Sequence, residues 1–495
     1  LGGSRADDMV LAGSTEGGAF MAPGDWNRGF RRRYFQPGSL AAQFASYHDP
    51  AGGVFIATQD TVGYHKAITI TRQNDGLEYS WSHQCFHPLT EPYELPYQVV
   101  CTTFRSSTPE RPCDWHDAAD IHKRWAMKQP WCAKTVAERK DIPDWIKDGC
   151  IRVQWELRSD GGPDVVSDWL DNKWSKYFPK TPPFLTFFGF EKVANWVAPK
   201  YTPFYPSDEA FTAMTRKIAD MGGHVCLFPS TYQWTLTRKQ RPDGSFEWDD
   251  RQDFAARGEK HAVKDRMGTT VLKKPSWLQG GQTAALCRGD AWTRNFFADA
   301  VDDMAARGVD VVQLDQVVGG AWPSDGRTAC FDTEHGHPPG FGRWDSDAAR
   351  EQMTLLRTRA DAKYPGMVFS LESPQELFAQ DFGLYDYRHA RSVFSINQWE
   401  QYPRKHAAIF PYLYNEYIPV FHIPPHGEPV ALILAQAVIS GEMPSCKQHQ
   451  MRFPGETLVV NGDFDKPDGN PAGWTIWRSK AQGQAIVEHD SAKPG

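Results

Sequence analysis

The sequence predicts a multidomain protein of the β plus α/β class. We expect an incomplete N-terminal antiparallel β-sandwich with a linker helix (1–140), a central (β/α)8 TIM-type barrel (141–450) and the start of a C-terminal β jelly roll (455–495). Two observations support this prediction. A chain of 495 residues is too long for one ordinary domain. Its pattern also changes, after about residue 183, from short strand-like runs to alternating strands and helices.

The N-terminal part lacks helical periodicity until late. The runs 54–58, 66–70 and 98–104 are short, apolar and separated by Gly, Pro, Asn and Asp, which is typical of antiparallel strands. The segment 114–126 then carries apolar residues at helical spacing. Asp114 is a suitable N-cap for it, because its side chain can accept a hydrogen bond from an unpaired backbone N–H group. We therefore expect a β-sandwich followed by a linking helix.

The central part alternates strands with helices, which implies parallel strands. Two insertions, 230–290 and 317–345, follow expected strands and should overhang one end of the barrel, where long loops are usually functional. Besides the two strands described next, the expected strands are 184–190, 224–229 and 417–423, and the expected helices are 207–221, 292–307, 346–363 and 429–441.

Two of the expected strands end in a carboxylate. The segment 308–316 contains a glycine, a buried strand and then Asp315, and the segment 366–373 repeats this order with Glu372. In a parallel barrel the carboxyl ends of the strands converge on one mouth, where catalysis takes place. Two carboxylates facing each other across such a mouth are what cleavage of a glycosidic bond requires. We therefore predict Asp315 and Glu372 as a catalytic pair.

Each of these acids has a second interpretation. Asp315 can instead cap an element or form a salt bridge. Glu372 has a rival in Glu376, which would lie in the first turns of a helix that begins at Ser373 and Pro374. Carboxylates also stabilise helix N-termini, so either glutamate can have that role alone. Glu372 is preferred as the acid/base because it lies directly at the end of its strand.

The long loop after Asp315 contains a His-x-His motif, His335 and His337, flanked by Trp322 and Trp344. Such a pair can chelate a metal, but no clear third ligand accompanies it, so we predict no metal site and no cofactor. Hydrogen bonds from the histidines to sugar hydroxyls are preferred, with a purely structural role as the alternative. Indole rings can stack on the faces of sugar rings or pack in the core. The predicted substrate-binding residues are His335, His337, Glu376, Trp322, Trp196 and Glu416.

Composition excludes several classes of protein. The net charge of −7 and the pI of about 6.2 argue against a nucleic-acid binder, and no apolar run is long enough to span a bilayer. The 9 cysteines form no C-x-x-C motif, so most are expected to be free and buried. The 19 tryptophans suit a carbohydrate-handling protein.

No signal peptide is visible, but we expect a secreted, cell-surface or periplasmic bacterial protein. Its oligomeric state stays open.

Several motifs, taken in order, resemble a known group of proteins. The C-terminal segments 458–464 and 469–474 resemble the start of a jelly-roll carbohydrate-binding module. Residues 35 to 445 resemble a bacterial glycoside-hydrolase-like family of largely unknown specificity, whose barrel is similar to those of endo-α-N-acetylgalactosaminidases and, more distantly, α-galactosidases. The motifs are Trp125 at the end of the linker, Leu314-Asp315-Gln316, Cys330-Phe331-Asp332, His335-Gly336-His337-Pro338, and Leu371-Glu372-Ser373 followed by Glu376.

The resemblance implies a retaining mechanism on an α-linked sugar. In those relatives the nucleophile is an aspartate at the end of the fourth barrel strand, and Asp315 matches that position. Glu372 matches the acid/base by its placement. The insertion around His335 and His337 lengthens the gap between the two acids, so the substrate is not carried over.

Three hypotheses follow for the activity. The first is a retaining glycosidase acting on an oligosaccharide, polysaccharide or glycoconjugate. The second is a non-catalytic glycan-binding protein on a barrel scaffold. The third is a metal-dependent hydrolase that uses His335 and His337. The sequence leaves open the sugar, the linkage, and whether cleavage is terminal or internal.

Overall fold

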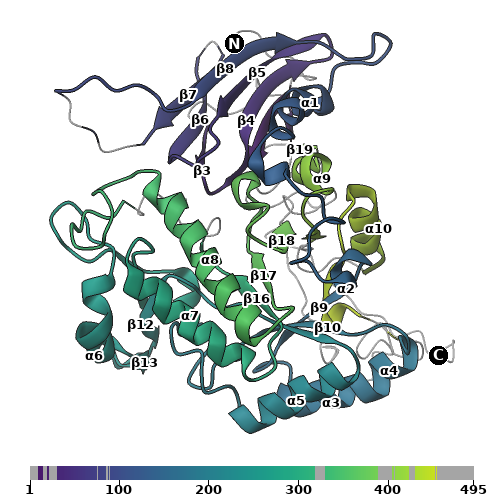
Figure 1. Cartoon of the computed structure of the whole chain (residues 1–495), viewed down its shortest axis with the longest axis vertical. Helices are drawn as coiled ribbons and strands as arrows, with labels where there is room; N and C mark the ends of the chain where they lie inside the picture. The colour runs from purple at the N-terminus through teal and green to yellow at the C-terminus, as the bar shows by residue number, and fades with distance from the viewer. Residues whose placement is uncertain are drawn as a thin grey trace, which may run out of the picture.

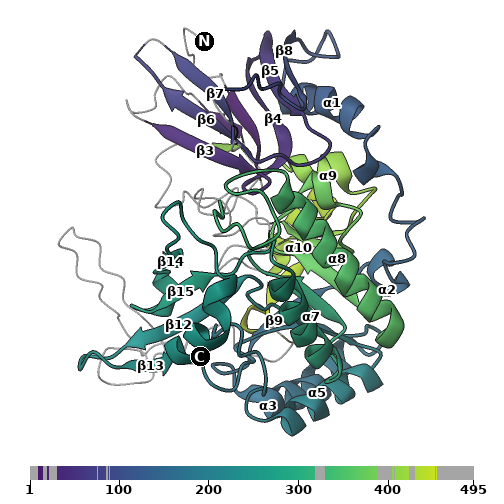
Figure 2. The same ribbon diagram turned by 60° about the vertical axis from the view of Figure 1, so that its left-hand side comes forward.

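A computed structural model of the chain describes residues 9–453, apart from 15–18, 22–29, 75, 85–86, 88–89, 318–328, 388–403, 406, 423–429 and 452. Antiparallel sheets from the N-terminal part lie at one end of the molecule, and a parallel barrel with its outer helices and one inserted antiparallel sheet lies at the other (Figures 1 and 2). The expected jelly-roll segment 455–495 lies outside the described residues.

The N-terminal part forms two antiparallel sheets, in agreement with the expected strand class, and one of them is extended by β19 from the later part of the chain. One has the order β19-β2-β1-β4-β5-β8 and the other β3-β6-β7. Val10, Leu40 and Ala45 from the first sheet share a core with Ile68 and Ile70 from the second. The strands are β1 (Met9–Ser14), β2 (Ala19–Met21), β3 (Arg31–Gln36), β4 (Leu40–Asp49), β5 (Gly52–Gln59), β6 (Lys66–Arg72), β7 (Leu77–His83), β8 (Gln98–Phe104) and β19 (Arg404–Lys405).

The predicted linker helix is confirmed as α1 (Trp115–Ala126), and Asp114 is its N-cap. The Asp114 carboxylate accepts a hydrogen bond from the His116 backbone N–H at 2.8 Å, and the Asp117 carboxylate accepts one from the Asp114 N–H at 3.0 Å. This capping box satisfies N–H groups that have no partner inside the helix. The helix lies beside the N-terminal sheets (Figure 1) and contacts both β4 (Leu40–Asp49) and α9 (Ile409–Tyr414).

The central part forms an eight-stranded parallel sheet in the order β20-β18-β17-β16-β11-β10-β9-β21. It is nearly closed, because Met443 donates a backbone hydrogen bond to Val420 (2.8 Å) and His422 donates one to Met443 (2.8 Å). The TIM-like fold is thereby confirmed. The strands are β9 (Arg152–Glu156), β10 (Phe184–Phe188), β11 (His224–Leu227), β16 (Val311–Leu314), β17 (Val368–Leu371), β18 (Leu384–Tyr387), β20 (Val420–His422) and β21 (Ser445–Lys447).

The alternation of strands and helices was recognised in the sequence only from residue 184 on, but the barrel begins one strand earlier. The segment 184–190 is the second strand rather than the first, because β9 precedes it. Strand β9 carries Arg152 and was not recognised as a buried strand. Inside the barrel the Arg152 guanidinium pairs with the Asp386 carboxylate at 2.5 Å, and both residues are at most 2% exposed. Two strands of the barrel thus each carry a buried charged residue, which interrupts the apolar run that identifies a buried strand in the sequence.

Helices pack around the barrel as expected (Figures 1 and 2). The predicted helix starts are supported by caps: the Ser207 hydroxyl accepts from the Ala210 N–H at 3.2 Å, and the Asp290 carboxylate accepts from the Thr293 N–H at 3.2 Å. The helices are α2 (Asp144–Lys147), α3 (Gly162–Trp169), α4 (Ser175–Tyr177), α5 (Asp208–Asp220), α6 (Arg251–Asp253), α7 (Ala291–Ala305), α8 (Trp344–Lys363), α9 (Ile409–Tyr414) and α10 (Val430–Ser440).

The first insertion is more ordered than a loop. It forms a four-stranded antiparallel sheet of β12 (Gln233–Gln240), β13 (Phe246–Asp249), β14 (Leu272–Lys273) and β15 (Gln282–Ala285). Its own small core contains Trp234, Leu236 and Phe254. The insertion is therefore a small unit added after β11.

Two global expectations can be compared with the described residues. The eight cysteines among them are free thiols, as expected for most of the nine, and five of the eight are buried. Within these same residues, no helix has the length and apolar character needed to cross a membrane.

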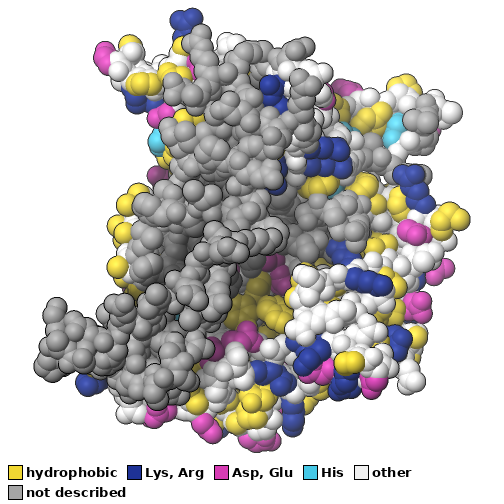
Figure 3. Space-filling model, turned by 180° about the vertical axis from the view of Figure 1, so that it is seen from behind, with side chains coloured by type: hydrophobic (Ala, Val, Ile, Leu, Met, Phe, Trp, Pro, Cys, Tyr) yellow, Lys and Arg dark blue, Asp and Glu magenta, His cyan; other side chains and the backbone are white. Residues whose placement is uncertain are grey.

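The face of the molecule seen in Figure 3 has a hollow where hydrophobic and acidic side chains come together.

Candidate active site

Asp315 and Glu372 come from neighbouring strands at the mouth of the barrel. Strands β16 and β17 are parallel, and Leu314 is paired with Leu371, so the two acids occupy the next equivalent positions. Counted along the chain from β9, these are the fourth and fifth strands of the barrel. The acids are thus side by side, which corrects the expectation that they face each other across the mouth.

Both acids are buried, with Asp315 6% and Glu372 5% exposed. One Glu372 carboxylate oxygen accepts a hydrogen bond from the Gln316 backbone N–H at 3.3 Å. Because Gln316 follows Asp315 directly, the Glu372 carboxylate reaches the end of the neighbouring strand. Gln316 has a left-handed φ of +62°, which costs free energy for a residue with a Cβ. The chain therefore turns sharply just after Asp315.

Residues that follow β11, the third strand of the barrel, also contact Asp315. The backbone N–H of Asp315 donates to the Pro229 carbonyl at 3.2 Å, and the Thr231 N–H donates to the Asp315 carbonyl at 3.3 Å. The Ser230 hydroxyl lies 3.4 Å from the Asp315 carboxylate and donates to it. Residues after β11 thus hold the backbone on which the predicted nucleophile is carried.

Aromatic side chains gather at the ends of the second and third strands. Trp196 and Phe228 make an edge-to-face contact with ring centroids 6.0 Å apart, and Phe188 lies 5.6 Å from Phe228 in the same geometry. Trp196 is half-buried and has a left-handed φ of +59°. Its backbone N–H donates to the Glu191 carboxylate at 3.1 Å. Glu191 therefore helps to hold Trp196 in this conformation.

Two further acids at this end of the barrel were not predicted. Glu156 ends β9, and burial raises its pKa to about 7, with the charge of Asp160 adding to the effect. Glu191 follows β10, and burial likewise raises its pKa to about 7. Carboxyl groups whose pKa is shifted by burial in this way are common at functional sites. Glu156 lies at the carboxyl end of a buried strand, as Asp315 does, so recognition of β9 in the sequence would have revealed it.

Glu376 lies in a different environment from Glu372. It is fully buried, and its carboxylate accepts hydrogen bonds from the Gln43 backbone N–H (3.0 Å) and the Tyr414 hydroxyl. The His122 ring nitrogen lies 2.7 Å from the same group. Glu376 thus connects β4, α1 and α9, and this placement favours a role in joining the N-terminal sheets to the barrel over substrate binding.

Two other predicted binding residues are not brought to the mouth. Glu416 is exposed and precedes β20, so it lies at the opposite end of the barrel, where its backbone carbonyl accepts from the Val136 N–H at 2.8 Å. This placement gives no support to substrate binding at the mouth. Trp322 lies outside the described residues.

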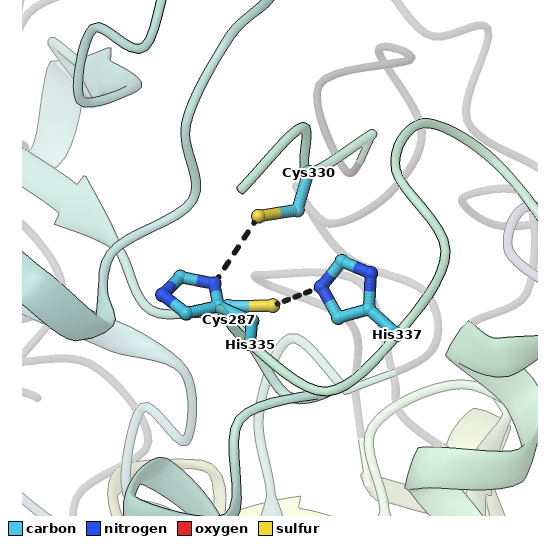
Figure 4. Close-up of side chains that lie close together, drawn as sticks. All are labelled: Cys287, Cys330, His335 and His337. Atoms are coloured by element: carbon cyan, nitrogen blue, oxygen red, sulfur yellow. Dashed lines mark hydrogen bonds between the residues drawn. The ribbon is translucent and has the colours of Figure 1, made fainter. Parts of the chain in front are cut away.

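The two predicted histidines lie together with two cysteines that sequence reasoning did not connect to them (Figure 4). The Cys287 sulfur is 3.1 Å from His337 Nε2, and the Cys330 sulfur is 3.3 Å from His335 Nδ1. The hydrogen bond with Cys287 lowers the pKa of the Cys330 thiol, and the two imidazoles lower it further. Cys287 and Cys330 are far apart in the sequence, so no local motif could have revealed the cluster.

The family model described as "Domain of unknown function (DUF6259)" matches residues 93–423. The chain belongs to the DUF6259 family. A curated relative, "Putative glycoside hydrolase" of Bacteroides thetaiotaomicron, is 20% identical over 337 residues, which is 64% of this chain and 42% of the relative. The chain therefore spans less than half the length of that relative.

Solved structures share the fold of this DUF6259 chain. The ligand-free α-N-acetylgalactosaminidase NagBb from Bifidobacterium bifidum aligns with a TM-score of 0.62 at 12% identity, over 90% of this chain and 71% of NagBb. The α-galactosidase TtGalA from Thermus thermophilus aligns with a TM-score of 0.52 at 12% identity, over 89% of this chain and 82% of TtGalA. The predicted resemblance to a glycoside-hydrolase-like family with such a barrel is confirmed.

Proposed function

We propose that this DUF6259 chain is a retaining glycosidase that cleaves an α-linked sugar, with Asp315 and Glu372 as its catalytic residues. The observation that carries this proposal is the in-register placement of the two acids at the ends of adjacent strands. The glycoside-hydrolase-like fold supports the general activity. The names of the structural neighbours make α-galactosides and α-N-acetylgalactosaminides the first substrates to test.

The strand geometry favours retention over inversion. Neighbouring strands lie about 4.8 Å apart, and residues at equivalent positions project from the same face. The backbones that carry the two acids are therefore about 5 Å apart, a spacing from which the carboxylates can reach the separation of a retaining enzyme. Retaining enzymes need about 5–5.5 Å, whereas inverting enzymes need about 6.5–9.5 Å to admit a water molecule.

In the proposed mechanism Asp315 attacks the anomeric carbon while Glu372 protonates the departing glycosidic oxygen. The bond to the leaving group breaks as the ester between Asp315 and the sugar forms. Glu372 then removes a proton from water, which attacks the anomeric carbon and releases Asp315 as a carboxylate. Two inversions give net retention.

The half-buried Trp196 indole is proposed to stack on a sugar ring near the second strand. The edge-to-face contact of the indole with Phe228, and the hydrogen bond from the Trp196 backbone N–H to the Glu191 carboxylate, hold the residue in position. A fixed aromatic face lowers the entropy lost on binding. The proposed substrate is an extracellular glycan, which agrees with the expected secreted, cell-surface or periplasmic location.

The test is hydrolysis of aryl α-galactosides and aryl α-N-acetylgalactosaminides by the full chain and by Asp315→Ala. We expect turnover by the wild type and a loss of at least about 10³-fold in the variant. Asp310→Asn is the matched control, because Asp310 precedes the same strand at the opposite end of the barrel and should leave turnover unchanged. Circular dichroism checks that both variants are folded. Equal turnover by wild type and Asp315→Ala would exclude the assignment.

A further inference from the structure

A cluster of two cysteines and two histidines lies outside the proposed catalytic pair. The sulfurs of Cys287 and Cys330 and one ring nitrogen each of His335 and His337 all lie within 4.8 Å of one another. Figure 4 shows these four groups directed toward a common centre. Both cysteines and His335 are buried, and His337 is half-buried. We propose that this cluster binds a structural zinc ion.

The set of ligands matches zinc chemistry. Structural zinc sites in proteins are closed and tetrahedral, and two cysteines with two histidines are one of their standard sets. With bonds of about 2.3 Å to sulfur and about 2.0 Å to nitrogen, ligand atoms in such a site are about 3.3–3.8 Å apart. The observed 3.1 Å and 3.3 Å contacts therefore require only small adjustments of side chains.

The histidine rings are held in the form that a metal requires. His335 Nε2 is 2.9 Å from the Lys260 carbonyl, and His337 Nδ1 is 2.8 Å from the Pro338 carbonyl. A carbonyl only accepts, so each of these nitrogens must donate its N–H. In the neutral ring the other nitrogen then carries a lone pair, and in both residues that nitrogen is the one facing a sulfur. Such outer hydrogen bonds are a regular feature of metal-bound histidines.

Packing fixes His337 from two sides. Its ring is stacked on Trp344 with centroids 3.7 Å apart and an interplanar angle of 8°. On the Gly289 side, an added Cβ would lie 2.3 Å from His337 Cδ2. Gly289 therefore permits an approach that no other residue would allow. The ring is positioned before any ion binds, which reduces the entropic cost of binding.

The zinc would join two insertions that are separate in the sequence. Cys287 follows β15 of the first insertion, whereas Cys330, His335 and His337 belong to the loop between β16 and α8. Cross-linking them would stabilise the segment that continues from the Asp315 strand. All four positions of a tetrahedral zinc would be filled by protein, leaving none for water or substrate. This argues against the hydrolase that uses a metal held by His335 and His337.

The first test is the metal content of the full chain, purified from zinc-supplemented cells and freed of loosely bound metal. Elemental analysis should find about one zinc per chain. Cys330→Ser and His337→Asn should reduce the zinc content at least about tenfold. Cys101→Ser is the matched control, because Cys101 is an exposed cysteine outside the cluster and should leave the content unchanged.

A second measurement does not depend on the folding of any variant. When the metal-free wild-type chain is titrated with Co²⁺, a tetrahedral thiolate site should give intense visible absorption bands, and zinc should abolish them. A wild-type chain that neither carries zinc nor gives these bands would overturn the proposal. So would mass spectrometric detection of a Cys287–Cys330 disulfide in the purified chain.

Discussion

The barrel mouth and the cysteine–histidine cluster are built in opposite ways. At the mouth, Asp315 and Glu372 occupy equivalent positions on adjacent strands, and their contacts with Ser230 and Gln316 are long, at 3.4 and 3.3 Å. In the cluster, residues from two insertions converge, and backbone carbonyls fix the far nitrogen of both rings at 2.9 and 2.8 Å. The mouth thus follows from the register of two neighbouring strands, whereas the cluster depends on contacts between two insertions that are distant in the sequence.

Among substitutions at these two regions, Glu372→Ala is expected to have the largest effect on activity. Loss of the proton donor should reduce hydrolysis of an alkyl α-glycoside by about 10²–10⁴-fold. The melting temperature should change little. With an aryl substrate, added azide should restore turnover and give a product of retained configuration, because azide attacks the glycosyl–Asp315 ester. Absence of azide rescue, or a product of inverted configuration, would contradict the acid/base role.

Glu376→Ala should lower stability but retain activity, although Glu376 is only four positions after Glu372. The substitution removes the buried acceptor shared by His122, Tyr414 and the Gln43 backbone. We expect a loss of about 3–5 kcal/mol in the free energy of unfolding. Activity per folded molecule should be retained at low temperature. A stable variant without activity would instead place Glu376 in the catalytic machinery.

Glu191→Gln tests whether the unpredicted acids at the mouth are held protonated. Burial raises the Glu191 pKa from 4.5 to about 7, so the folded protein keeps a proton that the unfolded chain releases between these values. Stability should therefore decrease as the pH rises through this window. The variant should lack this component and be more stable than the wild type above pH 7, on the order of 3 kcal/mol.

Thermal unfolding of both proteins from pH 4 to pH 8 provides the measurement. Glu156 and Glu442, whose pKa values burial also raises to about 7, contribute with the same sign in both proteins. The difference between the two curves reports the titration of Glu191, including its charge repulsion with Glu156. Parallel curves would show that Glu191 is ionised in the folded protein.

The smallest effect is expected for Trp196→Ala. Loss of a stacking surface worth about 0.5–1.5 kcal/mol should raise KM by roughly 2–10-fold, with little change in kcat. Trp277→Ala is a suitable control, because Trp277 is an exposed indole in the insertion after β11. An unchanged KM in Trp196→Ala would assign this indole to packing against Phe188 and Phe228.

The sequence predicted the parts of the fold that follow local rules. The helix α1 with its Asp114 cap, the helices α5, α7 and α8, and the buried apolar strands that precede Asp315 and Glu372 were all recognised from local patterns. Strand β9 was missed because its Arg152 is neutralised by Asp386, a contact between distant strands. Such a contact leaves no trace in either local pattern.

The candidate site shows the same limit. Asp315 and Glu372 were found because both follow a buried strand directly. Glu376 was predicted to bind substrate, whereas it is held by His122 and Tyr414. These two residues come from elements that are distant in the sequence, so the local pattern did not reveal the contacts. The His-x-His motif did not indicate a metal site, because its companions Cys287 and Cys330 meet it only after two insertions have folded.

Trapping the sugar on its nucleophile is the most direct test of the proposed role of Asp315. The full chain would be treated with a 5-fluoro-α-glycosyl fluoride of the sugar that the aryl glycoside screen shows to be cleaved, then digested and analysed by mass spectrometry. We expect one glycosyl adduct on the peptide that contains Asp315, formed in parallel with loss of activity. An active protein that forms no adduct, or carries it on another residue, would contradict a retaining mechanism through Asp315.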